Sequence, residues 1–383
     1  MSMSKNDQDI HTEENGQEEE PEGLDTPSES SGWGGDYPLD SVFVRKEHRT
    51  VSEVIKRIKA KRFILNPDFQ RDFVWSIKKQ SRLIESCLMR IPLPVLYVAE
   101  DRDGKIVVVD GLQRLITFSR YLDDEFALRG LGEGKADFPG DNLLLGKKFT
   151  DLPLNLQERV EDTQLTLCIL DSKAPNRAKL DIFERVNSGE PLSRQQMRNC
   201  LFNGPATRWL RKASQSKAFL KATGGGLSKK TMRDREAINR FCAFRLLGPE
   251  KYKGDMDDFL AKCLERMNET GKEDLENLYH AFDRSMSSNY FLFKKHAFRK
   301  SLTETGPGPR KTVINIALFD VCSVIFSKID PSIVEDNAEK IRAAIIKLLK
   351  EDGFVRGITY GTNNLFQVLL RFAWMKKAVE EAL

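Results

Sequence analysis

Histidine is scarce in this sequence of 383 residues: it occurs four times, as His11, His48, His280 and His296. None of the four is followed by proline within three residues, and their spacing does not gather a set of imidazole ligands. A metal-dependent nuclease of the histidine type needs imidazoles close together in space. The sequence therefore does not predict such an active site, and each histidine is interpreted as a surface or packed residue.

Cysteine motifs and long hydrophobic runs are also absent. The six cysteines are widely spaced, and no pair has the short spacing of metal ligands. This pattern indicates reduced, buried thiols rather than a zinc site or a disulfide framework. No apolar run approaches the roughly 18 residues that cross a bilayer, and the acidic N-terminus is unlike a signal peptide. We expect a soluble, cytoplasmic protein with no membrane association.

Basic residues are nearly absent from the first 40 residues, which contain twelve acidic residues and one lysine, a net charge of −11. Because this segment also has almost no large apolar side chains, residues 1–40 are predicted to be a disordered acidic tail. The rest of the chain has 60 basic and 45 acidic residues, a net charge of +15, which is compatible with contact to DNA or RNA. The tail is interpreted as a solubilising extension; the alternative is that it folds back and competes for the basic surface.

The most informative pattern is KIVVVDGLQRLITF, residues 105–118. A β-branched apolar run predicts a buried strand, and helical spacing of apolar residues follows at once after the sharp turn at Asp110 and Gly111. The new helix N-terminus, with Gln113 and Arg114 in its first turn, is a candidate anion site, because free N–H groups, the helix dipole and a guanidinium group suit a phosphate. Asp110 stands where a metal or water ligand belongs. An ordinary strand-turn-helix with a solvated arginine is the alternative.

Two further segments place polar side chains among aromatic or helical residues. In NPDFQRDFVW, residues 66–75, Gln70 and Arg71 stand among three aromatic side chains, which suits a cleft with aromatic walls. In IFERVNSGEPL a helical face runs into an Asn-Ser-Gly helix stop, where Arg185 and Asn187 are able to reach a ligand. The alternatives are packed core aromatics and an ordinary helix C-terminus.

The coarse pattern divides the chain into an α/β half and a helical half. Strands are predicted around 63–65, 95–99, 105–109 and 165–170, with helices at 77–89, 112–122 and 152–164. Ser193 and Gln196 have the spacing of a capping box, and from there helical spacing dominates. The predicted fold class is α+β, with a small α/β domain over 41–203 followed by an all-α domain over 204–383.

Two basic clusters in the helical half are candidates for phosphate contact. The first, Lys229, Lys230, Arg233 and Arg235, follows three glycines and is the predicted nucleic-acid contact. The second, at 294–300, lies beside three phenylalanines, which permits base stacking. The favoured interpretation of the second cluster is a helix with buried phenylalanines and solvated lysines.

Three of these segments fit one family pattern, in the same order and with the same spacing. The pattern is P-x-F-Q-R-x-(Y/F)-V-W, then D-G-Q-Q-R-L, then F-x-R-(I/V)-N-x-G-x-x-L. The matching residues are Pro67, Phe69, Gln70, Arg71, Phe73, Val74 and Trp75, then Asp110, Gly111, Gln113, Arg114 and Leu115, then Phe183, Arg185, Val186, Asn187, Gly189 and Leu192. The chain from about residue 50 to 205 therefore resembles the N-terminal domain of GmrSD-type, modification-dependent restriction systems, which is related in fold to ParB and sulfiredoxin.

This resemblance implies a pocket that handles a nucleotide and is required for nucleoside triphosphate hydrolysis or for activity on DNA. It implies Asp110, Gln113 and Arg114 as catalytic residues, with Asp110 as ligand of a divalent metal such as Mg²⁺. The nucleotide-binding residues that it implies are Gln70, Arg71, Gly111 and Arg114. Arg185 and Asn187, which are able to reach a ligand, are predicted to bind the same nucleotide. It also implies work in prokaryotic defence against foreign or modified DNA.

Two departures from the family leave alternatives open. Leu112 stands where the family usually has Gln, so hydrolysis is slow or absent if that Gln orients water, and unaffected if its side chain merely packs beneath the turn. The HNH nuclease half of many members, marked by a His close to a Pro, has no counterpart here. The alternatives to an NTP hydrolase are a nucleotide or DNA sensor that recruits a separate nuclease or defence subunit, and a domain that nicks DNA itself. DNA is the expected partner, and a homo-oligomer is compatible with the sequence.

Overall fold

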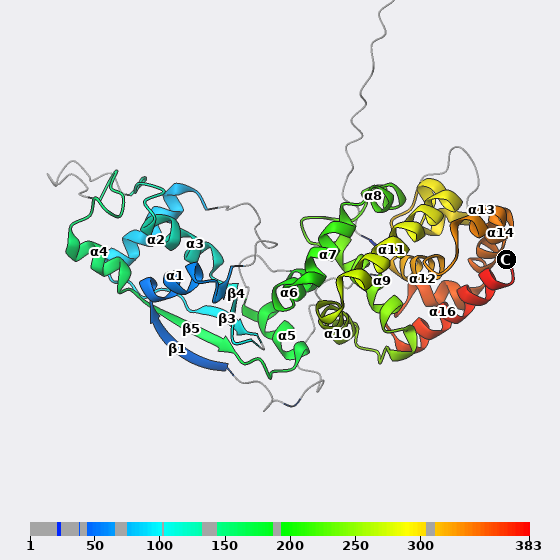
Figure 1. Cartoon of the computed structure of the whole chain (residues 1–383), viewed down its shortest axis with the longest axis horizontal. Helices are drawn as coiled ribbons and strands as arrows, with labels where there is room; N and C mark the ends of the chain where they lie inside the picture. Colours follow the sequence, from blue (N-terminus) through cyan, green and yellow to red (C-terminus); the bar gives the residue numbers. More distant parts are fainter. Residues whose placement is uncertain are drawn as a thin grey trace, which may run out of the picture. The chain divides into compact units, whose positions relative to one another are not determined.

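The computed structural model of the protein describes residues 21–23, 38, 44–65, 75–101, 103–131, 144–186, 193–303 and 311–383. The chain divides into two compact units (Figure 1). The α/β unit lies within Pro27–Arg208 and also includes helix α10 (Met256–Glu269). The helical unit consists of Trp209–Asp255 and Thr270–Leu383 together with the N-terminal residues up to Thr26.

A mixed sheet forms the centre of the α/β unit (Figure 1). Its strands are β1 (Val44–Thr50), β2 (Phe63–Ile64), β3 (Leu96–Glu100), β4 (Ile106–Asp110) and β5 (Gln164–Leu170). Their order across the sheet is β1-β5-β3-β4-β2; the β1/β5 and β3/β4 pairs are antiparallel, and the β5/β3 and β4/β2 pairs are parallel. β4 thus lies between two other strands, and its residues 106–109 are all buried, which accounts for the unbroken apolar run in the sequence.

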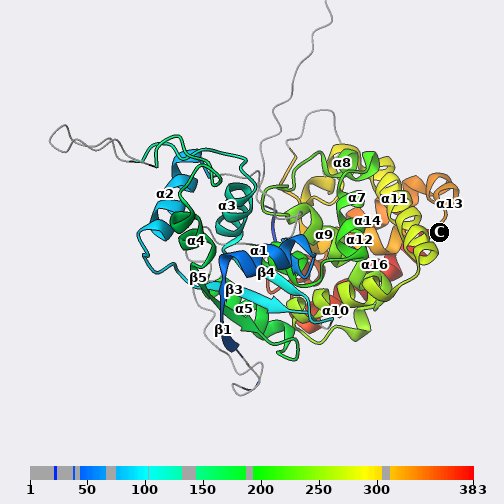
Figure 2. The ribbon, with the colours of Figure 1, turned by 60° about the vertical axis from the view of Figure 1, so that its left-hand side comes forward.

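Helices cover both faces of this sheet (Figures 1 and 2). One face carries α1 (Val51–Lys59), α2 (Ile77–Leu88), α3 (Leu112–Leu122) and α4 (Leu154–Glu161), which enclose the larger hydrophobic core. The other face carries α5 (Asn176–Val186) and α6 (Arg194–Leu201), which form a smaller core. Val108 belongs to the first core and Val109 to the second, as the alternation of side chains along a strand requires.

Ion pairs attach α10 to the α/β unit. Asp257, in the first turn of α10, accepts a hydrogen bond from Arg198, and its Oδ2 lies 3.4 Å from Arg177 Nη1 and 3.6 Å from Arg194 Nη1. Arg198 is fully buried, and a buried charge is stable only with a partner. These three arginines of α5 and α6 therefore hold α10 in the α/β unit. In the sequence, α10 lies within the half that is predicted to be helical.

The helical unit is arranged around α12 (Ile316–Phe326), which is buried over almost its whole length. The other helices are α7 (Pro205–Ser214), which enters the unit at Trp209, α8 (Lys217–Thr223), α9 (Arg233–Leu246), α11 (Lys272–Phe293), α13 (Pro331–Asp336), α14 (Ala338–Leu348), α15 (Asp352–Thr359) and α16 (Leu365–Glu380). Short 3₁₀ turns occur at Pro249–Lys251, Lys294–His296 and Lys300–Thr303.

A buried charge cluster joins three of these helices. Asp320 of α12 accepts hydrogen bonds from Arg240 Nε and Nη2 of α9, at 2.9 and 2.6 Å, and from Arg371 Nη2 of α16, at 2.9 Å. All three side chains are at most 1% exposed. Because each arginine depends on the same carboxylate for its counter-charge, the cluster fixes the positions of α9, α12 and α16 relative to one another.

The structure confirms the predicted α+β class and many of its elements. Helix α3 has the predicted bounds, the capping box of Ser193 and Gln196 forms at the start of α6, and all six cysteines are buried. β1 and α1 were not predicted. In the described part of the chain no helix has both the length and the hydropathy needed to cross a membrane.

Within the acidic tail that the sequence predicts to be disordered, the structure describes residues 21–23 and Pro38. Glu22 is hydrogen-bonded to Ile314 and Asn315 of the helical unit. Composition alone does not reveal this contact, because its partners lie almost 300 residues further along the chain.

Candidate functional site

Gly111 forms the turn between β4 and α3. Its φ is +96°, a left-handed conformation that side chains other than glycine rarely adopt. A Cβ atom at this position would lie 2.0 Å from Leu96 Cδ2, which belongs to the buried core. Both the backbone angle and the close approach of β3 therefore require glycine, and this brings Asp110 directly before the first turn of α3.

The first turn of α3 offers unoccupied hydrogen-bond donors. Gly111 is the N-cap residue and supplies no side-chain cap. The backbone N–H groups of Leu112, Gln113 and Arg114 donate no hydrogen bond within the described residues. Such an end carries a partial positive charge and binds anions readily. The predicted phosphate site at this turn therefore has the donors that it needs.

Arg114 holds the turn against the start of β3. Its guanidinium donates to the backbone carbonyls of Pro94 and Val95, the latter at 3.1 Å, and to Asp110 Oδ2 at 3.0 Å. The side chain is only 12% exposed, and burial lowers the pKa of Arg114 whereas Asp110 opposes that shift. Arg114 is thus a structural clamp, and a bound phosphate would share it with these three acceptors.

Asp110 and Gln113 retain acceptor atoms for a ligand. The Asp110 side chain is 39% exposed, and its Oδ1 accepts no hydrogen bond among the described residues. Gln113 Oε1 is buried and also lacks a hydrogen-bond partner in that part of the chain. A buried amide oxygen without a partner is costly, so this atom suits a donor supplied by a ligand or by water.

Among the described residues, no cluster of side chains completes the ligand set of a divalent metal at Asp110. Nowhere in the described ranges do three His, Cys, Asp or Glu side chains gather closely enough to hold a metal ion. Asp110 offers one unengaged carboxylate oxygen. Mg²⁺ is commonly bound in this way, by one or two carboxylates together with substrate phosphates and water. The donor set thus fits a metal that arrives with a nucleotide.

Leu112, the departure from the family pattern, packs against the larger hydrophobic core. Its side chain is therefore engaged beneath the turn. An apolar residue fits this position, and the turn keeps its geometry without the Gln of the family.

The other predicted nucleotide-binding residues are only partly covered by the structure. Gln70, Arg71 and Asn187 lie outside the described residues. Arg185 is exposed in the last turn of α5 and makes no ion pair within the described ranges.

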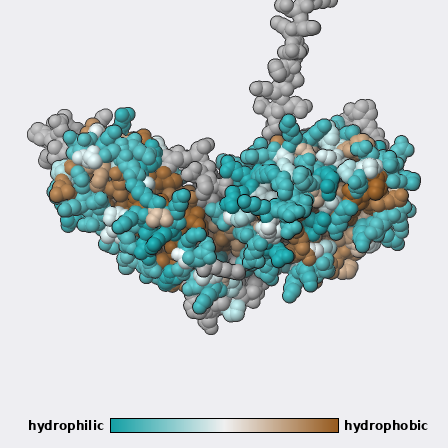
Figure 3. All heavy atoms as spheres, viewed as in Figure 1, coloured by the Kyte–Doolittle hydropathy of each residue, from teal (hydrophilic) through white to brown (hydrophobic). Residues whose placement is uncertain are grey.

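The predicted nucleic-acid cluster contains two kinds of basic residue. Lys229 and Lys230 are exposed. Arg233 pairs with Glu236 at 3.0 Å, and Arg235 lies against the sulfur of Met232. The face of the helical unit that carries α7 and α8 is largely hydrophilic (Figure 3). Lys229 and Lys230 are the exposed members of the cluster, and this exposure suits contact with phosphates.

The second basic cluster has the buried phenylalanines that the favoured interpretation predicts. Phe293 is 7% and Phe298 is 1% exposed, so neither is available to stack on a base. Arg299 is also buried, whereas Lys294 lies over the rings of Tyr290 and Phe291.

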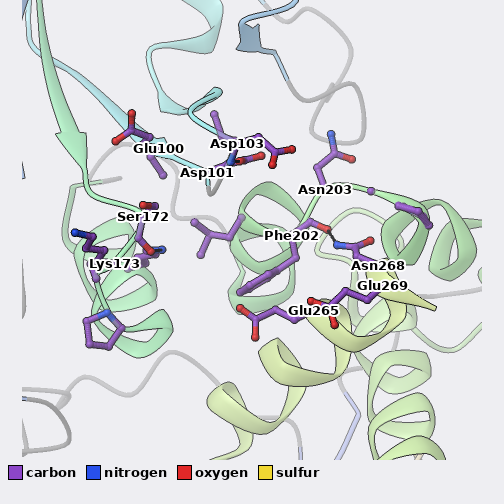
Figure 4. A pocket seen from close by; sticks show the side chains of 18 residues that line it. Glu100, Asp101, Asp103, Ser172, Lys173, Phe202, Asn203, Glu265, Asn268 and Glu269 are labelled. Carbon is purple, nitrogen blue, oxygen red and sulfur yellow. Dashed lines mark hydrogen bonds between the residues drawn. The ribbon is translucent and has the colours of Figure 1, made fainter.

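The α/β unit also contains a cavity of about 680 Å³ that the sequence did not indicate (Figure 4). It is lined from the β3–β4 turn, the segment after β5, the α6–α7 turn and the end of α10. Figure 4 shows Asp101 and Asp103 on one side and Glu265 and Glu269 on the other. Five carboxylates and two lysines line it, a charge balance that disfavours a polyphosphate. The sequence did not predict this cavity, because its four lining segments are far apart in the sequence and are brought together only by the fold.

Comparison with known proteins identifies part of the chain. Residues 51–203 match the family model described as GmrSD restriction endonuclease, N-terminal domain. This range contains the Asp110 turn and the helices on both faces of the sheet. Neither the search of curated proteins nor that of solved structures returns a match.

Proposed function

We propose that this protein binds a nucleoside triphosphate at the Asp110 turn and hydrolyses it while acting on foreign or modified DNA. The match of residues 51–203 to the model of the GmrSD restriction endonuclease N-terminal domain supports this proposal. The context is prokaryotic restriction and defence. The nucleotide phosphates bind the first turn of α3, and the helical unit contacts DNA. Localisation in the cytoplasm follows from such a role.

The observation that supports this proposal is the group of hydrogen-bond donors and acceptors at the Asp110 turn that have no partner among the described residues. The three unengaged N–H groups of α3 suit phosphate oxygens. Asp110 Oδ1 suits a Mg²⁺ ion bound to those phosphates, or the attacking water. The buried Gln113 Oε1 accepts a hydrogen bond from water or from the nucleotide. Gln70, Arg71, Arg185 and Asn187 complete the nucleotide site in this proposal.

The alternative is a sensor without turnover, which is favoured by Leu112. If the Gln of the family orients water, Leu112 leaves a site that binds the nucleotide and passes a signal to a separate nuclease. In the sensor, Leu112→Gln would introduce phosphate release into a protein that has none. In the hydrolase, the same substitution would change an existing rate and would also weaken packing, because Leu112 contacts the core.

Phosphate release tests the proposal. ATP, GTP and CTP are supplied with Mg²⁺, with and without plasmid DNA, to the wild type, Asp110→Asn and Gln113→Ala. We expect both variants to lose about 100-fold or more in rate, the usual cost of removing a group that acts at the reacting centre. Asp162→Asn and Gln164→Ala are the matched controls, because they alter exposed side chains of the same unit.

The possible outcomes of this experiment distinguish the hydrolase from the sensor. Release that both controls retain and both site variants lose supports the hydrolase. Nucleotide binding without release in the wild type, lost in Gln113→Ala, supports the sensor. Release that is equal in all five proteins would place the chemistry elsewhere. Conversion of supercoiled plasmid to its nicked form, measured in the same reactions, reports on nuclease activity of the domain itself.

DNA contact is tested separately by its salt dependence. Removing the charges of Lys229 and Lys230 together should weaken DNA binding. The negative slope of log K against log salt should become shallower by about 2, since each lost phosphate contact removes about one unit. Lys376→Ala/Lys377→Ala is the matched control, because these lysines are exposed on α16 of the same unit. An unchanged slope for the Lys229/Lys230 variant would argue against this contact.

A further inference from the structure

A short N-terminal segment, residues 21–23, is attached to the helical unit. The Glu22 N–H donates to the carbonyl of Ile314 at 2.8 Å, and the Ile316 N–H donates to the carbonyl of Glu22 at 2.9 Å. These two bonds form a parallel β-bridge between Glu22 and Asn315, just before α12. The main chain of the segment is therefore held at both its donor and its acceptor.

The carboxylate of Glu22 occupies a site built for an anion. It lies 2.5 Å from Lys300 Nζ and 3.2 Å from Asn315 Nδ2. Asn315 is fully buried and fixed, because its Oδ1 caps α12 at the Leu318 N–H and its Nδ2 also donates to the Ile358 carbonyl. A charged and a neutral donor therefore meet one carboxylate at the start of a helix, where negative charge is favoured.

This site adjoins the segment that leads to the predicted DNA contact. Ile314 forms an antiparallel bridge with Arg299, and Arg299 Nη2 donates to the carbonyl of Thr223 at 2.9 Å. A Cβ on Gly226 would lie 3.2 Å from Arg299 Nη2 and 3.5 Å from Ile314 Cδ1. The side chain of Ile314, the residue whose backbone carbonyl binds Glu22, thus lies against the glycine turn that precedes Lys229.

The N-terminal residues and the part of the helical unit around the glycine turn have opposite net charges. Residues 1–26 contain nine acidic residues and one lysine, a net charge of −8. Residues 209–255 contain twelve basic and four acidic residues, a net charge of +8. Because Glu22 is bound to the helical unit, this negative charge is tethered to the same unit that contains the basic segment.

We infer that the acidic N-terminal segment, anchored by Glu22, competes within the molecule with nucleic-acid phosphates for the basic surface of the helical unit. The inference rests on the proposed contact with DNA. Glu22 makes the contacts that a phosphate oxygen would make with Lys300 and Asn315. Binding of DNA then requires release of the segment, which lowers the apparent affinity for DNA. Because salt also weakens the contact that is displaced, this competition makes the affinity less sensitive to salt.

The test measures DNA affinity by fluorescence anisotropy of a labelled duplex, using the full-length chain. Glu22→Ala removes the anchoring carboxylate and should tighten binding about fivefold or more near 0.1 M salt, where charges at these distances still interact. Glu20→Ala is the matched control, because it removes the same charge from the segment and none of the described contacts. It should change the affinity less than twofold. Equal affinities of the wild type and Glu22→Ala would overturn the inference.

Hydrogen exchange at the Ile316 amide reports release of the segment independently of affinity, because this amide donates to Glu22. Added DNA should raise its exchange rate in the wild type, and unchanged exchange in the presence of bound DNA would refute competition. Heparin serves as a second polyanion. If heparin speeds the exchange but no variant binds DNA, the acidic segment competes with polyanions and the proposed contact with DNA is rejected. No response to either polyanion would reject both.

Discussion

Arg114 provides the sharpest test of how the Asp110 turn is held together. Its guanidinium contacts two backbone carbonyls of the segment before β3 and the carboxylate of Asp110. Arg114→Ala removes all three contacts at once. We expect the free energy of unfolding to fall, because the turn loses its connection to β3.

The magnitude follows from the exposure of each partner. Pro94 is exposed, so water is able to replace that hydrogen bond, and the Asp110 carboxylate is 39% exposed, so its ion pair is screened. The bond to the half-buried Val95 carbonyl contributes most. Together these terms give a loss of about 2 kcal/mol, since a hydrogen bond from a charged donor contributes about 1.5 to 3 and an exposed ion pair less than 1.

Urea denaturation followed by circular dichroism measures this loss. Arg114→Lys keeps the charge but not the fork of donors, and we expect it to lose about half as much. The control is Arg159→Ala, because Arg159 Nη1 makes a single 3.3 Å bond to the Leu88 carbonyl and should cost less than about 1 kcal/mol. Unchanged stability of Arg114→Ala would refute the clamp. Lost phosphate release in that variant would then identify Arg114 as a ligand contact alone.

Three further substitutions test other parts of the structure, each by urea denaturation. Gly111→Ala should lose about 2 to 4 kcal/mol, because it combines a positive φ with a Cβ 2.0 Å from Leu96 Cδ2; a loss below 1 would show that the turn adapts. Asp320→Asn should lose about 3 to 5 kcal/mol, because Arg240 and its neighbouring arginine remain buried without a counter-charge; retained stability would contradict that dependence. Burial raises the pKa of Asp234 to about 6 from an unfolded value of 3.8, so ionisation of this group opposes folding and stability falls as pH rises from about 4 to 6. Asp234→Asn should therefore be more stable than the wild type above pH 6, by up to about 3 kcal/mol, and the gain should vanish below pH 4; a gain independent of pH would exclude this cause.

The sequence by itself determined the features that depend on neighbouring residues. The apolar run before Asp110, the glycine after it and the helical spacing that follows fix a strand, a turn and a helix within 17 residues, 106–122. The capping box at Ser193 is likewise a matter of residues three apart. The family pattern adds order and spacing over a longer range, and it agrees with the match over 51–203.

Tertiary structure alone decided how the side chains of that turn are used. Arg114, predicted as a phosphate ligand, also binds carbonyls about 20 residues earlier in the chain, and Leu112 packs against the core. These partners are distant in sequence, so local spacing contains no information about them.

Long-range electrostatic contacts account for the other differences. Asp257 is held by arginines of the α/β unit about 60 to 80 residues earlier, and Glu22 is held by Lys300. Composition predicted the signs of these charges but not their partners. A charge chooses its partner by proximity in the folded chain, and burial then determines how much that partner contributes.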